Sequence, residues 1–339
     1  MKTLLRTIGI VAAVLVLYAG ACAVRREIRN RGNTRIVSDA QVTTISLTID
    51  GTERRALVHV PSGADATATL PLVLMLHGAG GTAEMALVET AFVARSDAHQ
   101  FIVAFPEATR PDAGKPAAFG SNDPTWNDGS GRFHSGQRNV ADVEFIARLL
   151  DEIESRYSVD RSRIFVAGFS NGASMAFRIG IELSDRIAAV APVAGALWIR
   201  EPKCARPVSL LYITGTADSL NPMEGGVPNP ARSFRFERVS DTAKPPVIEH
   251  ITKWSNMLGC MSAPVTLTNT PAGVTTTVYE GCRGESRVVF TTIAGHGHTW
   301  PGGTNALPSF IVGDDTSPVS ATDEIWKFFA AHARDTHPK

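Results

Sequence analysis

Runs of basic residues are missing from this 339-residue chain beyond residue 31, and its 33 lysines and arginines equal its 33 aspartates and glutamates. A nucleic-acid-binding surface needs an excess of positive charge, so we expect no nucleic-acid partner. Internal repeats are also missing. Apolar residues make up 44% of the chain, which is enough for a large core. The length would allow two domains, but α/β sheets often extend this far as one unit.

Cysteines are few, at four, and their spacing resembles no metal-binding motif. Cys204 has no histidine or cysteine at ligand spacing, so we expect a lone buried thiol and no metal site. Cys260 and Cys282 flank a segment with the pattern of a β-hairpin. In an exported protein these two could form a disulfide, and the alternative is that both are small buried hydrophobic residues. The sequence assigns no role to Cys22.

The N-terminal segment carries the one long apolar run, at 7–24, which Lys2 and Arg6 precede. Small residues at 19–21 offer a cleavage site, so we expect a signal peptide at 1–24 and a secreted or periplasmic protein. The run is almost long enough to span a bilayer, and four arginines follow it within 25–31, so an uncleaved membrane anchor is the alternative. Residues 25–42 are expected to be a polar linker.

The rest of the chain alternates between strand and helix patterns, which predicts an α/β fold with a mostly parallel sheet and helices on both faces. We expect one domain at 43–334. The expected strands are 43–49, 55–60, 71–76, 101–105, 163–167, 187–193, 208–213, 265–267, 275–279 and 287–293, and the expected helices are 82–98, 139–157, 171–183, 247–257 and 322–333. A long irregular insertion at 107–138 is expected to be functional or disordered.

A Gly-Phe-Ser-Asn-Gly motif at 168–172 joins one of these strands to the following helix. A strand that turns sharply into a helix at Gly-x-Ser-x-Gly is a nucleophile elbow, which exposes the serine. Gly168 and Gly172 fit the crowded positions on either side of Ser170, where a Cβ atom would clash. The motif predicts that Ser170 is a nucleophile.

Candidates for the partners of Ser170 also follow strand ends. Asp218 follows the strand at 208–213, and His298 follows the strand at 287–293. The order Ser, Asp, His along the chain is that of an α/β-hydrolase triad, in which His298 acts as the base and Asp218 orients it. This chemistry needs no cofactor. The weaker candidates are His296, Asp185, Asp241 and Asp314, while His250, His332 and His337 are expected to be solvated.

The remaining expectations concern binding of substrate. An oxyanion hole needs two backbone N–H groups, and we assign them to Asn171 and Ala79. His77 is expected to shape the loop that contains Ala79. Trp126 and Trp300 could each offer a flat apolar face to an acyl group or a sugar ring, and packing in the core is the alternative for both.

Four blocks together resemble the polyhydroxybutyrate depolymerase and feruloyl esterase family of secreted α/β-hydrolases. They are His-Gly-Ala-Gly-Gly at 77–81, Gly-Phe-Ser-Asn-Gly at 168–172, Gly-Thr-Ala-Asp at 215–218 and Gly-His-Thr-Trp-Pro-Gly at 297–302. The resemblance implies the α/β-hydrolase fold, a triad of Ser170, Asp218 and His298, and pairing of Cys260 with Cys282.

The resemblance also implies a serine carboxylic-ester hydrolase that acts through an acyl-enzyme. Its members cleave polyester, feruloyl or acetyl esters, so the expected substrate is a polyester oligomer or a plant cell-wall ester. The alternative function is a catalytically silent binding protein with the same fold, anchored at the membrane. The intact triad argues against silence.

Overall fold

The computed structural model describes residues 41–64, 68–228, 242–267, 270–305 and 307–334. Residues Val42–Lys339 belong to one compact unit. The expectations for 1–24, for almost all of 25–42, and for Asp241 and His337 lie outside the described residues. Within the described ranges, no helix is both long enough and apolar enough to cross a bilayer.

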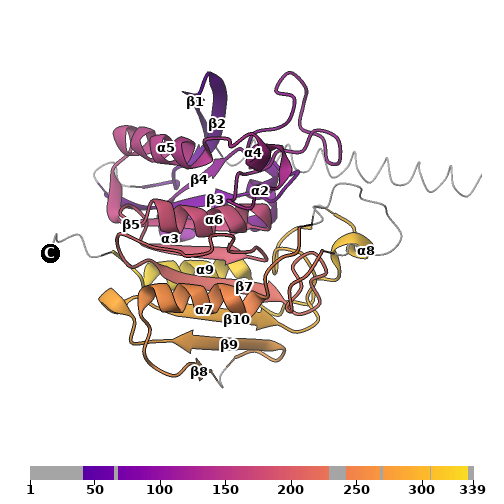
Figure 1. Cartoon of the computed structure of the whole chain (residues 1–339). Helices are drawn as coiled ribbons and strands as arrows, with labels where there is room; N and C mark the ends of the chain where they lie inside the picture. The colour runs from indigo at the N-terminus through magenta and orange to yellow at the C-terminus, as the bar shows by residue number, and fades with distance from the viewer. Residues whose placement is uncertain (1–40, 65–67, 229–241, 268–269, 306, 335–339) are drawn as a thin grey trace, which may run out of the picture. The chain divides into compact units, whose positions relative to one another are not determined.

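One sheet runs through the molecule, with the strand order β1-β2-β4-β3-β5-β6-β7-β10-β9-β8 (Figure 1). Its strands are β1 (Thr43–Ile49), β2 (Thr52–His59), β3 (Leu70–Leu76), β4 (Ile102–Pro106), β5 (Val159–Phe169), β6 (Ala189–Val193), β7 (Ser209–Gly215), β8 (Val265–Thr266), β9 (Val274–Tyr279) and β10 (Val288–Ile293). The central strands from β4 to β10 are parallel, and the pairs at both edges are antiparallel. The predicted fold class is therefore correct: this is the arrangement of an α/β-hydrolase.

Helices cover both faces of the sheet. They are α2 (Ala83–Thr90), α3 (Phe92–His99), α4 (Phe133–Gln137), α5 (Asp142–Arg156), α6 (Asn171–Glu182), α7 (Val247–Leu258), α8 (Ser309–Val312) and α9 (Ala321–Ala330), with a short 3-10 turn η1 (Arg283–Glu285). In Figure 1, α5, α6 and α7 lie in front of the sheet, and α3 and α9 lie behind it.

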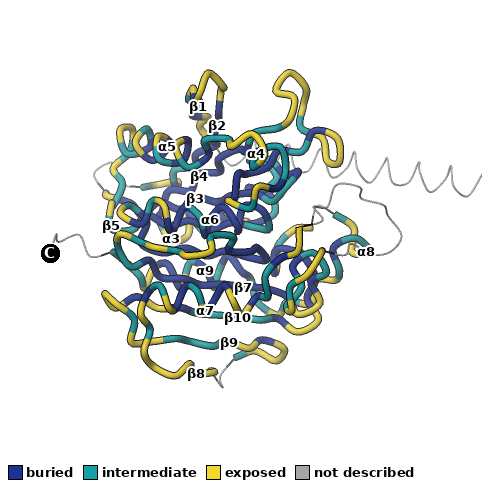
Figure 2. The backbone as a smooth tube through the Cα atoms, viewed as in Figure 1, coloured by how far each residue is buried: buried dark blue, intermediate teal, exposed yellow. Residues whose placement is uncertain are grey.

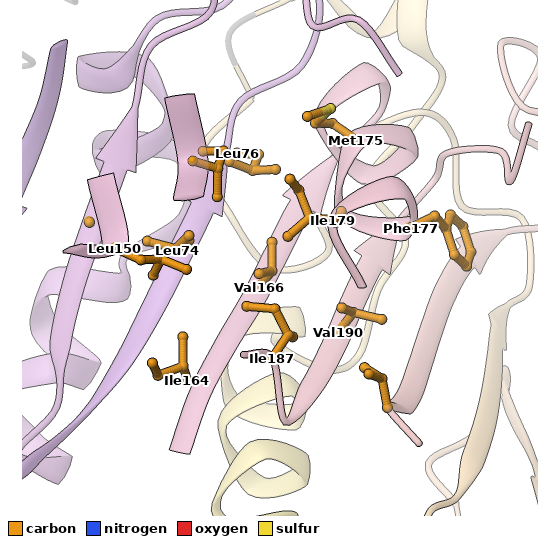
Figure 3. Close-up of a cluster of buried hydrophobic side chains, with 14 of the residues drawn as sticks. Leu74, Leu76, Leu150, Ile164, Val166, Met175, Phe177, Ile179, Ile187 and Val190 are labelled. Atoms are coloured by element: carbon orange, nitrogen blue, oxygen red, sulfur yellow. The ribbon is translucent and has the colours of Figure 1, made fainter. Parts of the chain in front are cut away.

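The two faces are built from alternate residues of the same strands, because successive side chains of a strand point to opposite sides. Leu74 and Val166 face the helix layer of α5 and α6, where they pack with Ile179 (Figure 3). Phe165, beside Val166, instead stacks on Phe329 of α9, with ring centroids 4.6 Å apart. Figure 2 shows the resulting buried centre, with exposed residues at β8 and in the outer loops and mostly intermediate burial along β9.

The helix predicted at 82–98 is wrong in one respect, because it is broken into α2 and α3 at Ala91. Ala91 has a left-handed backbone with φ of 54°. The carbonyl groups that a continuous helix would use are taken elsewhere: Glu89 O accepts from Thr304 N–H, and Thr90 O accepts from the Thr322 hydroxyl. Distant hydrogen bonds therefore override the local helical pattern here.

Adjacent strands place the chemistry-bearing loops at one end of the sheet. β5 pairs with β6, β6 with β7, and β7 with β10, all in parallel. In the last pair Gly215 lies opposite Ile293, so the loops that follow β7 and β10 start side by side. Ligand and catalytic sites of open α/β sheets lie at this carboxyl edge.

Candidate active site

Ser170 lies between the end of β5 and the start of α6 in a strained backbone conformation, with φ of 54° and ψ of −115°. Such values are rare for a residue with a side chain and are characteristic of functional turns. A Cβ atom at Gly168 would clash with the carbonyl oxygen of Gly172, and one at Gly172 would clash with the carbonyl oxygens of Leu76 and His77. The two glycines thus let the strand, the turn and the neighbouring loop approach closely.

A continuous chain of hydrogen bonds joins Ser170, His298 and Asp218. His298 Nε2 lies 2.8 Å from Ser170 Oγ, and His298 Nδ1 lies 2.7 Å from Asp218 Oδ2. His298 and Asp218 are buried, and the ring of Phe169 lies 5.0 Å from the His298 ring. The structure therefore brings together the three side chains that the sequence singled out, from positions up to 128 residues apart.

The Asp218 carboxylate is well suited to remain ionised. Burial by itself raises the pKa of Asp218, but attraction to His298, the hydrogen bond with it and the charge of Lys244 together hold the pKa below its ordinary value. Its second oxygen, Oδ1, accepts backbone hydrogen bonds from Leu220 at 2.9 Å and Asn221 at 2.8 Å. An ionised, fixed carboxylate is what an orienting partner of histidine requires.

The weaker candidates lie elsewhere. His296 is buried, but its Nε2 lies 3.1 Å from the Thr299 hydroxyl and its Nδ1 lies 3.3 Å from Asp315. These contacts fix the shape of the loop after β10 and occupy both ring nitrogens. Asp185 and Asp314 are exposed.

The loop after β3 lies directly against the Ser170 side chain. A Cβ atom at Gly78 would lie 3.3 Å from Ser170 Cβ. Farther along the loop, Gly80 N–H donates to Pro124 O at 2.9 Å and Gly81 N–H donates to Gly78 O at 3.0 Å, so both amides are engaged. His77 has the expected loop-shaping role, because its Nδ1 contacts Gly78 O at 2.7 Å and its Nε2 accepts from Ala108 N–H at 3.1 Å.

The insertion at 107–138 is ordered around Asn171, a connection that the sequence did not reveal. The side chain of Asn171 accepts from Trp126 N–H at 2.7 Å and donates to Asp128 Oδ2 at 2.9 Å. Asp128 in turn forms a buried salt bridge with Arg132 at 2.9 Å. The first residue of α6 is thereby held by the insertion, in which only the short helix α4 has regular structure. Its richness in Gly, Pro, Asn and Asp signalled a loop but not this partner.

Neither tryptophan offers a face to a ligand, so the substrate-binding expectation for both is corrected to a packing role. Trp126 is 0% exposed, and its indole N–H donates to His77 O at 3.0 Å. Trp300 is 3% exposed, packs edge-on against Phe92, and donates to Thr322 Oγ1 at 3.0 Å. Both rings instead support the loops that carry the candidate catalytic groups.

His250 is another correction. It was expected to be solvated, but its side chain is fully buried beside Phe177 and Tyr212. Burial is the main reason that its pKa falls to about 3, and the charges of Lys244 and Lys253 act in the same direction. The sequence predicts that α7 is a helix, but the burial of His250 depends on Phe177 and Tyr212, which pack against it from other elements.

Two of the cysteines are joined. Cys260 and Cys282 form a disulfide that ties the end of α7 to the loop after β9. Cys204 forms no disulfide, as expected of a lone thiol, but it is half-buried rather than buried. Burial raises the pKa of this thiol more than the nearby Arg283 lowers it.

Comparisons with known proteins show which proteins this chain resembles. Residues 59–225 match the Phospholipase/Carboxylesterase family model. The chain is 30% identical over 297 residues to the candidate esterase NocK of Nocardia uniformis subsp. tsuyamanensis, covering 85% of this chain and 83% of that protein. It is 32% identical to feruloyl esterase B of Piromyces equi and 28% identical to poly(3-hydroxyalkanoate) depolymerase C of Paucimonas lemoignei, each over 72% of this chain. It spans only 42% and 58% of those two proteins.

A solved structure gives the same fold. The acetyl xylan esterase of Aspergillus awamori superposes with a TM-score of 0.52 at 18% identity, covering 76% of this chain and 94% of that one. The fold and the site together define a serine carboxylic-ester hydrolase of the α/β-hydrolase class, and the alternative of a silent binding protein is not favoured. The chain belongs to the polyhydroxybutyrate depolymerase and feruloyl esterase family.

Proposed function

We propose that Ser170 is the nucleophile of this esterase, that His298 is its general base, and that Asp218 orients His298. The observation that supports these roles is the hydrogen-bond chain from Asp218 through His298 to Ser170. Residues 43–334 would then form the catalytic domain.

The reaction proceeds in two halves. His298 Nε2 takes the proton of Ser170 Oγ as this oxygen bonds to the ester carbonyl carbon, and the imidazolium then gives the proton to the departing alkoxide. The alcohol leaves and an acyl-enzyme remains. In the second half His298 deprotonates water, whose oxygen attacks the acyl carbon, and Ser170 Oγ leaves with that proton. The free carboxylic acid is released.

The negative oxygen of the tetrahedral intermediates is assigned to the backbone N–H groups of Asn171 and Ala79. Asn171 is the first residue of α6, where backbone N–H groups lack partners within the helix and the helix dipole favours negative charge. The amides of Gly80 and Gly81 are engaged within their loop, which supports Ala79 as the second donor. Loss of one such donor typically removes about 3 kcal/mol of transition-state stabilisation.

Three variants test the catalytic roles, with p-nitrophenyl acetate as substrate. Ser170→Ala and His298→Ala should each lower kcat by at least about a thousandfold, because the triad acts as a unit. His296→Ala serves as the comparison, and circular dichroism establishes that each variant is folded. Turnover near wild type in Ser170→Ala, or a larger loss in folded His296→Ala than in His298→Ala, contradicts the assignment.

The proposed substrate is a polyester oligomer or a plant cell-wall ester, in keeping with the activities for which the relatives are named. With both tryptophans buried, Phe119 is the aromatic residue that we assign to substrate contact. Its side chain is 51% exposed, and its ring lies so close to Gly80 that an added Cβ there would be 2.7 Å from it. The buried Asn122 side chain braces the same loop by donating to three backbone carbonyls within 112–116.

Turnover of feruloyl, acetyl-xylan and hydroxybutyrate esters identifies the substrate among these classes. Phe119→Ala should raise KM for the bulky acyl esters by about tenfold and leave p-nitrophenyl acetate turnover unchanged, since a buried aromatic contact contributes about 1.5 kcal/mol. Met261→Ala, at a site 89% exposed, is the control. If the KM of Phe119→Ala equals that of wild type for every ester tested, the proposed contact between Phe119 and the substrate is contradicted.

Export through the segment 1–24 completes the proposal. The disulfide between Cys260 and Cys282 supports it, because such bonds persist in oxidising compartments. The mass of the protein recovered from the periplasm or medium of an expressing bacterium tests cleavage near residue 21. An intact N-terminus in a membrane fraction would instead support the anchor.

A further inference from the structure

A buried lysine is fixed to the loop that carries Asp218. Lys244 Nζ donates a hydrogen bond to Asn221 Oδ1 at 3.1 Å, and the whole residue is buried. Its backbone N–H and carbonyl also exchange hydrogen bonds with Gly226, at 2.8 and 2.9 Å. Because Asn221 and Gly226 both follow Asp218 closely in sequence, main chain and side chain together hold Lys244 to this loop.

Asn221 connects this lysine to Asp218. It is 1% exposed, and its backbone N–H donates to Asp218 Oδ1 at 2.8 Å. Its side-chain amide donates to the Tyr212 hydroxyl at 2.8 Å and lies 3.3 Å from Thr214 Oγ1. Since Lys244 satisfies the remaining oxygen, the Asn221 side chain has partners for both of its polar atoms and is held in one orientation.

The Tyr212 hydroxyl extends the connection to the nucleophile. It donates to Gly195 O at 2.7 Å, and Gly195 packs so closely on the elbow that an added Cβ would lie 2.6 Å from Ser170 O. One buried polar network therefore links the loop of Asp218 with the turn that packs against Ser170.

The charged and titratable groups around Lys244 come from the insertion, the loop after β7 and α7. Burial lowers its pKa to about 8, repulsion from Arg132 acts in the same direction, and Asp218 and Asp128 oppose the shift. His250, from α7, is neutral near neutral pH, because its pKa lies near 3. At neutral pH Lys244 therefore remains largely protonated in the interior.

Such a cation matters to a carboxylate in the same interior. While His298 is neutral, Asp218 is a buried negative charge that needs compensation beyond its two backbone donors. We propose that Lys244 and Asn221 are positioning residues of the esterase, which keep Asp218 ionised and aimed at His298 Nδ1 throughout the reaction. Neither residue touches the reacting atoms.

The expected effects follow from charge and geometry. Without the lysine charge, the pair of Asp218 and His298 binds a proton more readily, so the acid limb of the pH profile of kcat/KM moves to higher pH. Asn221 Oδ1 also loses a donor, which loosens the Asp218 loop and lowers kcat, whereas KM for a small ester is unaffected because no substrate contact is removed.

The test uses the full-length enzyme with p-nitrophenyl acetate from about pH 5 to about pH 9. Lys244→Met should lower kcat about tenfold and move the acid limb up by roughly 0.5 to 1 pH unit. Lys244→Arg, which keeps the charge, should restore the limb to its wild-type position. Lys253→Met is the matched control, because this lysine of α7 is 30% exposed and pairs with Glu249.

Two results would overturn the proposal: a Lys244→Met profile that coincides with that of Lys253→Met, or a limb shift that Lys244→Arg does not reverse. Should Lys244→Met fail to fold, Asn221→Ala decides the matter. It keeps the lysine charge, so kcat should fall about three- to tenfold with no shift of the limb, and an unchanged kcat contradicts the positioning role.

The positioning role of Lys244 and Asn221 rests on the proposed roles of Ser170 and His298, but the experiments separate an error in one from an error in the other. Turnover that survives in Ser170→Ala removes the proposed nucleophile itself. An unshifted profile in Lys244→Met, in an enzyme that still depends on Ser170, removes only the positioning pair.

Discussion

At the scale of single residues, buried polar groups hold the loops around the site. Arg54 of β2 donates to Asp142 of α5 at 2.7 Å, and the other Asp142 oxygen accepts from Asn127 N–H at 2.7 Å. This pair ties the insertion to a strand and a helix at once. Removing either partner would leave a buried charge uncompensated, which is usually strongly destabilising.

His250 gives a pH-dependent prediction. Its pKa is 6.5 in an ordinary setting and about 3 in the fold, so the unfolded chain binds more protons at intermediate pH. Stability from this site must therefore fall as the pH drops below about 6.5, by about 2 kcal/mol at pH 5. His250→Phe should remove that loss, because a ring of similar size packs against Phe177 without titrating.

Urea unfolding of wild type and His250→Phe at neutral pH and at about pH 5 measures this difference. His99→Phe, at an exposed position of α3, is the control and should keep the wild-type pH dependence. Parallel stability curves for wild type and His250→Phe contradict the account of His250.

At the scale of elements, the strand-to-helix turn at Ser170 depends on backbone contact. Gly172→Ala would drive a methyl group into the carbonyl oxygens of Leu76 and His77. The loop after β3 must then move away from Ser170, so we expect activity to fall at least about a hundredfold and stability to fall by more than about 2 kcal/mol.

Steady-state kinetics and thermal unfolding check this prediction. Gly114→Ala is the control, because its new methyl group would meet only Asp112 at 3.3 Å. A Gly172→Ala enzyme with wild-type kcat would mean that the turn and the loop do not pack as described.

The disulfide between Cys260 and Cys282 links α7 to the hairpin of β8 and β9 across 22 residues. Closing a loop of that length should stabilise the fold by about 3 kcal/mol through the entropy of the unfolded chain. The double variant Cys260→Ala with Cys282→Ala should lose about that amount in urea unfolding, and Cys204→Ala should lose much less. Equal stability of the double variant and wild type contradicts the contribution.

The elements that could be predicted are those whose signal is local. The elbow around Ser170 is predicted by one contiguous stretch of a strand, a serine between two glycines and a helix. Asp218 and His298 could be selected because each comes shortly after a predicted strand. The break at Ala91 could not be predicted, because its cause is a pair of hydrogen bonds from Thr304 and Thr322, more than 200 residues away.

At the scale of the whole molecule, the sequence does not predict which residues outside the regular elements are buried. Trp126 and Phe119 lie in the same irregular insertion, yet the first is fully buried and the second is 51% exposed. Lys244 and Asn221 lie in stretches with no periodic pattern, so nothing local marks them as neighbours of Asp218. Their roles emerge only when residues far apart in the chain are packed together.

The single compact unit of residues Val42–Lys339 leads to a prediction about the domain. A chain that starts at residue 42 should keep the kcat of the full-length protein within about twofold, because every residue assigned to the site lies in this unit. Purified proteins of both lengths, compared on p-nitrophenyl acetate, provide the measurement. A large loss of kcat in the shorter chain would assign the N-terminal segment a part in folding or catalysis.

The most direct test of the central claim is covalent labelling of the nucleophile. A fluorophosphonate reacts with a serine that a neighbouring histidine activates, so intact-mass and peptide analysis should find one adduct, on the peptide that contains Ser170. The adduct should be missing from Ser170→Ala and strongly slowed in His298→Ala. Full esterase turnover with no adduct at Ser170, or with the adduct on another residue, would contradict the account.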